Sequence, residues 1–427
     1  MNRTLLRNGT LQVVRLLACG VLLTTLGGCE GQIIGPPGAP QPGRSSWLSY
    51  KYSASCKDCP ELTEPTEEIV YYCSIDIQGG STRSYSVIDC AHPQRATVGL
   101  ADWLDSNGFS PGDADIVSER ARAIYGNLGD LRIGRDMNCL TTDTNGNVAC
   151  YVTNYGPAPF DPAAGPTGAV NPLWLGDNNF PQLGNAIDDA IAGHAPFATV
   201  AMVYNKNAAL QHGGVNAVTF YAFKADGSLL LSPALDGEGG KTSPRMCMAC
   251  HGGVYDTATH SVTGAQFLPF DSFYFEHSSQ PGYRPEDQQE SYRKLNKLVK
   301  ETVNATPAAA PGIVDFIKGT YNDAVDTALT PADGNYVPSG WAGHEKLYNS
   351  FYRKYCRMCH MASSTRPFLT FQDFQDLATT IENKVCQSLD MPNAQVPFVG
   401  FWQDPVAQID LRDFLKAQGL PDLHSCK

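Results

Sequence analysis

The sequence predicts an α+β fold, with strands concentrated before about residue 240 and helices after it. Between about 130 and 240, apolar runs alternate with Gly, Pro and Asn, and Asp226-Gly227 is a strong hairpin signal between two such runs. After residue 240, apolar residues recur at spacings of three and four, which is typical of helices that pack against a core. These two patterns favour a β-rich region in the N-terminal and middle parts of the chain and a helical C-terminal half.

The N-terminus has the features of an export signal. Three arginines precede an apolar run at 16–26, which is too short to span a bilayer. The run ends in Leu26-Gly27-Gly28-Cys29, which resembles the processing box of bacterial lipoproteins. The resemblance implies a signal peptide at 1–28 and a lipid on Cys29, and Glu30 in place of Asp implies the outer membrane. An ordinary signal peptide that is cut nearby is the alternative.

A linker and a cysteine-rich region follow. Residues 29–46 are rich in Pro and Gly and should form an extended linker. We expect 47–240 to be a largely β region stapled by disulfides, because exported chains meet oxidising conditions. Two disulfides, or alternatively one zinc site, can be formed by Cys56, Cys59, Cys73 and Cys90.

Within this region the spacing of apolar residues predicts helices at 98–104 and 116–125. Strands are predicted at 197–204, 215–224 and 228–231. A four-residue turn at 143–146 would pair Thr142 with Asn147, and this register places Cys139 opposite Cys150. We therefore predict a disulfide between Cys139 and Cys150. Further helices are predicted at 286–303, 309–321, 343–356, 370–385 and 405–418.

Two short motifs carry the chemistry. Cys247-Met248-Ala249-Cys250-His251 and Cys356-Arg357-Met358-Cys359-His360 both read C-x-x-C-H, the attachment signal for c-type haem. The two thiols of each motif add to the vinyl groups of one porphyrin, and the histidine becomes the proximal ligand of the iron. This composition produces one such match about 0.01 times by chance. We expect two covalently bound haem c groups; a redox dithiol or a zinc half-site is the alternative.

The segment 341–427 resembles a class I cytochrome c, in its order of helix, C-x-x-C-H motif, helix, Met-Pro loop and terminal helix. The resemblance implies that Met391, which precedes Pro392, is the sixth ligand of the second iron. The alternative is a methionine that packs in the core. Cys386 lies before this loop and Cys426 lies after the last helix, so a disulfide between them would tie the loop to the chain end.

The segment 241–340 contains the first motif, and its distal ligand is less clear. Met137 lies close to Cys139, in a loop that a disulfide could hold rigidly, and we choose it as the distal ligand. Met202 lies in an apolar run, and we expect it to pack in the core. A histidine is the second choice and an open site the third. Gly252-Gly253 suits a close approach of the backbone to a porphyrin. The candidate histidines are His92, His194, His212, His260, His277 and His344.

Three strings resemble a group of exported bacterial cytochrome c-like proteins: Ala149-Cys-Tyr-Val-Thr-Asn-Tyr-Gly156, Gln266-Phe-Leu-Pro-Phe-Asp271 and Arg357-Met-Cys-His360. Two covalently bound haems in one chain can relay electrons between a donor and an acceptor, so we expect a periplasmic, lipid-anchored electron carrier with redox proteins as partners. The net charge of −12 favours basic partners and argues against nucleic acid. A dihaem peroxidase with an open first haem is the enzymatic alternative. A cytochrome module fused to a separate binding domain at 47–240 is a third.

Overall fold

The computed structural model of the chain describes residues 99–109, 120–142, 147–156, 181–204, 218–230, 233, 243–256, 261–303, 307–363, 366–388, 391, 393–421 and 423. The predicted signal peptide and linker lie outside these residues, as do Cys29, Cys56, Cys59, Cys73, Cys90 and Cys426. Across the described segments the fold is mixed, with an antiparallel sheet and with helices in the C-terminal half, as the sequence predicts. No helix among the described residues combines the length and the hydropathy needed to cross a membrane.

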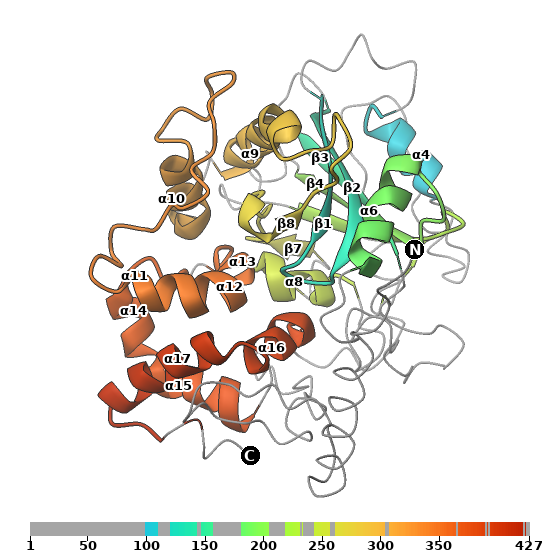
Figure 1. Cartoon of the computed structure of the whole chain (residues 1–427). Coiled ribbons are helices and arrows are strands. Elements are labelled where there is room, and N and C mark those ends of the chain that lie inside the picture. Colours follow the sequence, from blue (N-terminus) through green and yellow to red (C-terminus); the bar gives the residue numbers. More distant parts are fainter. Residues whose placement is uncertain are drawn as a thin grey trace, which may run out of the picture. The chain divides into compact units, whose positions relative to one another are not determined.

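Six antiparallel strands form the main sheet in the order β5-β4-β3-β2-β1-β8 (Figure 1). The first five follow one another along the chain as neighbours, and the short β8 adds to the edge at β1. Antiparallel neighbours of this kind need only short connections. The strands are β1 Arg120–Asn127, β2 Ile133–Thr141, β3 Val148–Tyr155, β4 Ala198–Tyr204, β5 Val218–Lys224 and β8 Phe275–Glu276.

The helix predicted at 116–125 is wrong over its described part, where the chain forms β1. Arg120 and Arg122 are exposed and alternate with the buried Ala121 and Ala123, which is the period of two of a strand. The full pairing of β1 with β2 outweighs the local spacing of apolar residues, because it satisfies the backbone hydrogen bonds of both strands.

The hairpin of β2 and β3 forms as predicted. Thr142 N–H donates to the Asn147 carbonyl at 2.8 Å, and the register places Cys139 opposite Cys150. The two sulfurs form a disulfide with an S–S distance of 1.99 Å. Cys386 is also disulfide-bonded.

Helix α6, Pro181–Ala192, covers one face of the sheet and is absent from the sequence prediction. It lies so close to β2 that a Cβ atom on Gly134 would be 2.1 Å from the Ala186 carbonyl oxygen. Glycine is therefore required at this position, because any side chain would push the helix away. Helix α4, Leu100–Ser106, is close to its predicted range.

The opposite face of the sheet packs against α9, Gln289–Val303. The Tyr125 ring stacks on Phe275 with centroids 3.9 Å apart, and both rings contact Tyr292 of α9. Helix α10, Pro311–Thr320, packs against α9 in the same core. The main core of the protein thus lies between this sheet face and helices from the second half of the chain.

The C-terminal helices surround a second core, in which Trp341 is fully buried. Trp341 contacts Tyr348, Tyr352 and Phe374, and its indole N–H donates to the Phe368 carbonyl at 2.8 Å. The segments are α11 Glu345–Leu347, the π-helical turn η5 Tyr348–Tyr352, α12 Arg353–Tyr355, α13 Arg357–His360, α14 Phe371–Asp376, α15 Ala378–Glu382, the π-helical turn η6 Asn383–Gln387, α16 Gln395–Trp402 and α17 Pro405–Ala417.

Candidate haem-attachment site

The first C-x-x-C-H motif forms most of a short helix, α8, Arg245–His251. Cys247 and Cys250 are free, half-buried thiols within one helical turn of each other. The helix ends at Gly252, whose φ of 67° lies in the left-handed region that favours glycine. The local fold therefore presents two thiols and one imidazole on a rigid turn.

The second motif has the same arrangement. Cys356 precedes α13, which carries Cys359 and ends at His360. Both sulfurs are free thiols. Burial raises the pKa of Cys356 to about 12, so this thiol is protonated at neutral pH.

The two motif histidines share one hydrogen-bonding pattern. The Nδ1 atom of His251 lies 2.8 Å from the Gln266 carbonyl oxygen, and Nδ1 of His360 lies 3.3 Å from the carbonyl oxygen of Arg366. A carbonyl only accepts, so each Nδ1 carries the proton and each Nε2 keeps its lone pair. Neither Nε2 has a hydrogen-bond partner among the residues that the structure describes.

Burial keeps both imidazoles neutral. It lowers the pKa of His251 and lowers that of His360 to about 4. A neutral imidazole with Nδ1 bonded to a backbone oxygen is the form that binds a metal through Nε2. The donor set of each motif, two thiols and one such imidazole, therefore fits a covalently attached haem.

The two motifs touch each other. The Cys359 thiol donates to the sulfur of Cys250 over 3.5 Å, although the two residues are 109 positions apart. This hydrogen bond and burial raise the pKa of Cys359 well above its ordinary value. A Cβ atom on Gly252 would lie 3.0 Å from the Ala362 carbonyl oxygen, just beyond the second motif. Helices α8 and α13 accordingly pack side by side (Figure 1).

Gly252 and Gly253 also have close contacts with protein backbone. Gly252 approaches Ala362, and a Cβ on Gly253 would lie 2.8 Å from the backbone nitrogen of Ala265. Both glycines have positive φ, 67° and 94°. They allow the chain to turn sharply after His251 and bring the two motifs together.

Met391 lies half-buried between η6 and α16, and packs against the C-terminal core as Cys356 does. Two residues later, Asn393 is buried with a φ of 56°, and its Nδ2 donates to the Met246 carbonyl at 2.9 Å. The loop of the expected second-haem ligand is therefore fastened to the helix of the first motif. Cys386 precedes this loop in a disulfide, and its predicted partner Cys426 lies outside the described residues.

The loop expected around Met137 is wrong, because Met137 lies within strand β2, which pairs with both β1 and β3. Cys139 is on the same face of the strand because side chains alternate. Met202 of β4 pairs with Phe220 of β5, whose ring is 5.5 Å from that of His251. Both methionines are half-buried and pack against the main core, which Cys247 also borders. The structure thus places Met137 and Met202 on the sheet face that the first motif contacts.

The described candidate histidines are engaged elsewhere or exposed. Nε2 of His277 lies 3.0 Å from the Tyr292 hydroxyl, and the His344 ring stacks on Phe371 with centroids 3.4 Å apart. The His194 side chain is 75% exposed. The remaining histidine candidates, which lie outside the described residues, are His92, His212 and His260.

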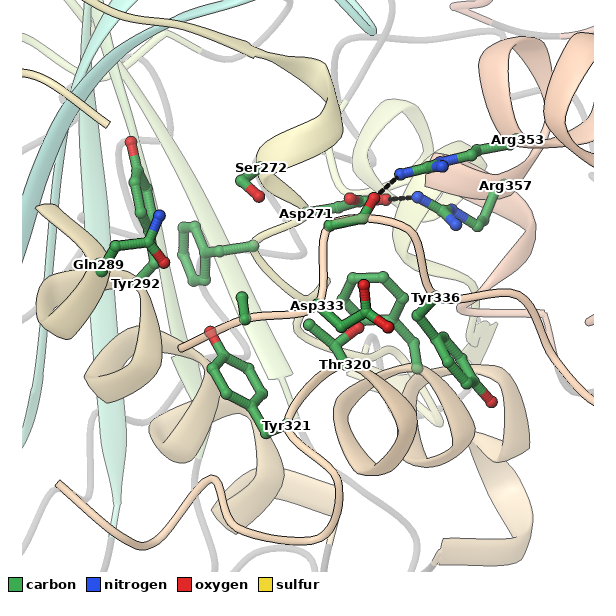
Figure 2. A pocket seen from close by; sticks show the side chains of 14 residues that line it. Asp271, Ser272, Gln289, Tyr292, Thr320, Tyr321, Asp333, Tyr336, Arg353 and Arg357 are labelled. Carbon is green, nitrogen blue, oxygen red and sulfur yellow. Dashed lines mark hydrogen bonds and ion pairs between the residues drawn. The ribbon is translucent and has the colours of Figure 1, made fainter. Parts of the chain in front are cut away.

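A buried ion pair behind the second motif joins it to the first-haem segment, and sequence reasoning missed it. Arg357 pairs with Asp271 across 86 positions, and its guanidinium also donates to the Tyr348 hydroxyl at 3.0 Å. Figure 2 shows Arg353 and Arg357 reaching toward Asp271. The string that contains Asp271 was noted only as a resemblance, and no local pattern identifies its partner.

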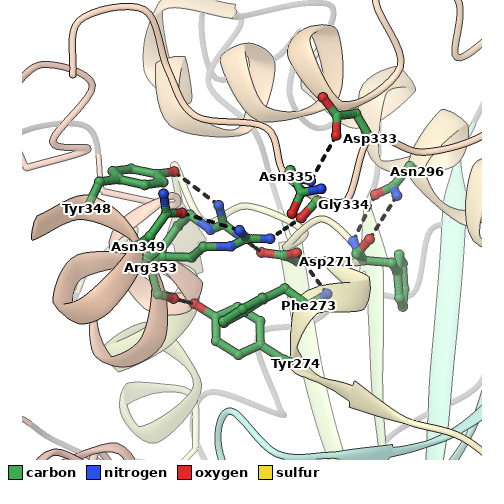
Figure 3. A network of polar contacts seen from close by, with 12 residues as sticks. Asp271, Phe273, Tyr274, Asn296, Asp333, Gly334, Asn335, Tyr348, Asn349 and Arg353 are labelled. Carbon is green, nitrogen blue, oxygen red and sulfur yellow. Dashed lines mark hydrogen bonds and ion pairs between the residues drawn. The ribbon is translucent and has the colours of Figure 1, made fainter. Parts of the chain in front are cut away.

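Arg353 extends this network, as Figure 3 shows. Its guanidinium donates to Asn349 Oδ1 at 3.3 Å and to the Gly334 carbonyl, and lies 3.9 Å from the centre of the Phe273 ring. The Tyr274 hydroxyl donates to the Arg353 carbonyl. A small pocket beside these groups is lined by residues such as Thr320 and Tyr336. The network holds α12 and the second motif against the segment that follows the first motif.

The four motif thiols do not form a zinc site. Over the described part of the chain, no group of three or more His, Cys, Asp or Glu side chains is placed to hold a metal ion. Comparison of the chain with protein-family models, with curated proteins and with solved structures finds no match.

Proposed function

We propose that the chain is a dihaem c-type cytochrome that carries electrons on the periplasmic side of a bacterial membrane. The proposal depends mainly on one observation: His251 and His360 have the same protonation pattern and the same kind of hydrogen-bond partner. Each follows two free thiols on one helical turn, each donates through Nδ1 to a backbone carbonyl, and each leaves Nε2 available. The hydrogen bond from Nδ1 to a backbone carbonyl occurs at both motifs, and chance placement of two histidines does not explain this repetition.

The chain's residues have defined tasks in this proposal. Cys247 and Cys250 would hold one haem through thioethers, and Cys356 and Cys359 the other. When bound, each haem supplies an iron that accepts and releases one electron. The carbonyls of Gln266 and Arg366 would hold the two imidazoles in a fixed orientation, with each Nε2 available to an iron.

The contact between the motifs supports a relay within one chain. Cys250 and Cys359 lie 3.5 Å apart, so the attachment points of the two haems are neighbours. Met391 is proposed as sixth ligand of the second haem, in keeping with the class I cytochrome c resemblance. The net charge of −12 favours basic redox proteins as partners.

Haem stoichiometry tests the proposal directly. Full-length protein made in a host with haem-attachment machinery should contain two haem equivalents that resist acid-acetone extraction. The variants Cys247→Ser/Cys250→Ser and Cys356→Ser/Cys359→Ser should each retain one equivalent. Wild-type protein with no covalent haem would refute the proposal.

The lipid anchor is proposed at Cys29, with the outer membrane as its location. Wild-type protein should carry acyl chains on mass spectrometry and fractionate with membranes, whereas Cys29→Ser should appear in the soluble periplasmic fraction. Cys19→Ser, within the same leader, is the matched control and should leave the anchor intact. An unacylated wild-type N-terminus would refute this part of the proposal.

A dihaem peroxidase is the second candidate, and one observation favours it. Of the described candidates from the sequence, His277 and His344 are engaged and His194 is exposed, which leaves Met137 and Met202 for the first iron. If neither binds, the first haem keeps an open position for peroxide. Rapid cyanide binding together with peroxide turnover would favour the enzyme, and slow binding without turnover would favour the carrier.

A further inference from the structure

The oxidation state of the cysteines divides them into two groups. Each described cysteine outside the motifs, namely Cys139, Cys150 and Cys386, is disulfide-bonded. The four motif cysteines are free thiols. A chain that holds disulfides at its other described cysteines therefore keeps two pairs of thiols that are open to the same oxidants.

Two of these thiols, one from each motif, already touch. The sulfurs of Cys250 and Cys359 are 3.5 Å apart, and a disulfide requires about 2.0 Å. A disulfide therefore requires the two sulfurs to approach each other by about 1.5 Å. The backbone contact of Gly252 with Ala362 and the Asn393–Met246 hydrogen bond hold the two segments together while the sulfurs move.

We propose that Cys250 and Cys359 are a redox-controlled modification site: before haem attachment they form a disulfide that joins the two motifs and withholds both from haem. This inference rests on the proposed function for its consequence, although the cross-link itself does not require haem. One bond would inactivate two sites, because each motif would be left with a single thiol. Reduction of that one bond would restore both.

The chemistry is thiol–disulfide exchange with the disulfide of an oxidised thiol–disulfide oxidoreductase, or with oxidised glutathione in the test. Two S–H bonds break and one S–S bond forms between Cys250 and Cys359. The two electrons and two protons pass to the oxidant, whose disulfide becomes two thiols. Once Cys250 and Cys359 are bound to haem as thioethers, they can no longer take part in thiol–disulfide exchange. The Cys250–Cys359 disulfide and the attachment of haem through all four motif cysteines therefore exclude each other.

The cross-motif bond competes with bonds inside each motif. Cys247 faces the Ser243 hydroxyl, with its sulfur 3.8 Å from the oxygen, while Cys250 receives the hydrogen bond of Cys359. The structure thus orients the second cysteine of each motif toward the other motif. We expect Cys250–Cys359 to form in preference to Cys247–Cys250 or Cys356–Cys359.

Peptide mapping decides between these bonds. Full-length haem-free protein is oxidised with oxidised glutathione, alkylated and digested with trypsin without reduction. Cleavage after Arg357 puts Cys356 on 355–357 and Cys359 on 358–384, while Cys247 and Cys250 share 246–293. The expected product joins 246–293 to 358–384. Closed single peptides, or a link to 355–357, would overturn the proposal.

Matched variants identify the two sulfurs. Cys247→Ser and Cys356→Ser should keep the cross-link, whereas Cys250→Ser and Cys359→Ser should abolish it. Under oxidising conditions Cys250→Ser should also increase covalent haem at the second motif relative to wild type, because Cys359 is released. An effect of general damage would lower that loading instead.

Incubation with reduced haem separates the two proposals. Reduced wild-type protein should become loaded at both motifs, and the oxidised cross-linked protein at neither. A cross-link without any haem uptake after reduction would refute the proposed function and leave the disulfide. Equal haem uptake by the reduced and oxidised forms would refute the control by the disulfide.

Discussion

Asn393 Nδ2 donates to the Met246 carbonyl oxygen at 2.9 Å, and this bond joins the loop of Met391 to the first haem motif. Asn393 is buried and has a φ of 56°, a conformation that asparagine tolerates better than most residues. Met391, the sixth ligand expected for the second haem, is therefore positioned partly by the helix that carries the first C-x-x-C-H motif. A substitution at the first motif should therefore alter the position of Met391 at the second haem site.

Asn393→Gly tests this link, because glycine keeps the positive φ and removes the amide. We expect a loss of about 1 kcal/mol in the free energy of unfolding, since one buried hydrogen bond is lost. The change should also weaken the sulfur-to-iron charge-transfer band of the second haem. Gly419→Ala, at another positive φ with no atom near its Cβ position, is the control that should leave the band unchanged.

Met391→Leu should abolish the sulfur-to-iron band and lower the potential of the second haem, because leucine keeps the volume of methionine and removes its soft ligand atom. Met361→Leu is the matched control, since Met361 is a buried methionine just beyond the same motif. Optical spectra and redox titration measure both effects. An unchanged band in Met391→Leu would assign the ligand to another residue.

Met137→Leu and Met202→Leu test the distal side of the first haem. We expect Met137→Leu to convert the first haem from low spin to high spin and to speed cyanide binding, because its ligand is removed. Met202→Leu should behave as wild type, since we expect Met202 to pack as core. Electron paramagnetic resonance of each variant gives the spin states. The reverse pattern would identify Met202 as the ligand, and two silent variants would indicate another ligand or an open site.

Breaking the buried Arg357–Asp271 ion pair should lower the free energy of unfolding more than breaking an exposed ion pair does. Asp271→Ala leaves a guanidinium that is 2% exposed without its carboxylate, which costs ~3–5 kcal/mol. The double variant Asp271→Leu/Arg357→Met should recover much of that loss, because it removes both members of the pair and leaves neither as an uncompensated buried charge. Chemical denaturation of the two variants and wild type measures this. Asp323→Ala, at an exposed pair with Lys318, should change stability by less than about 1 kcal/mol.

Features that depend on neighbours in the chain were predictable from the sequence. The spacing within each C-x-x-C-H motif requires a short turn, and both motifs lie on one. The turn between Thr142 and Asn147 set the register of β2 and β3, and with it the Cys139–Cys150 disulfide. In these cases the physical cause acts over a few residues, so the local pattern is sufficient.

Features that depend on distant segments were decided by the tertiary structure. The spacing at 116–125 indicated a helix, but pairing with β2 makes its described part a strand. The contact of Cys250 with Cys359 and the pairing of Asp271 with Arg357 join residues 109 and 86 positions apart. Such contacts form because the packing of the two cores brings their helices together. This packing is driven by the burial of apolar surface, which is non-directional and does not depend on how far apart the residues are in the sequence. The sequence alone therefore identified two separate C-x-x-C-H motifs, and only the folded chain places them side by side.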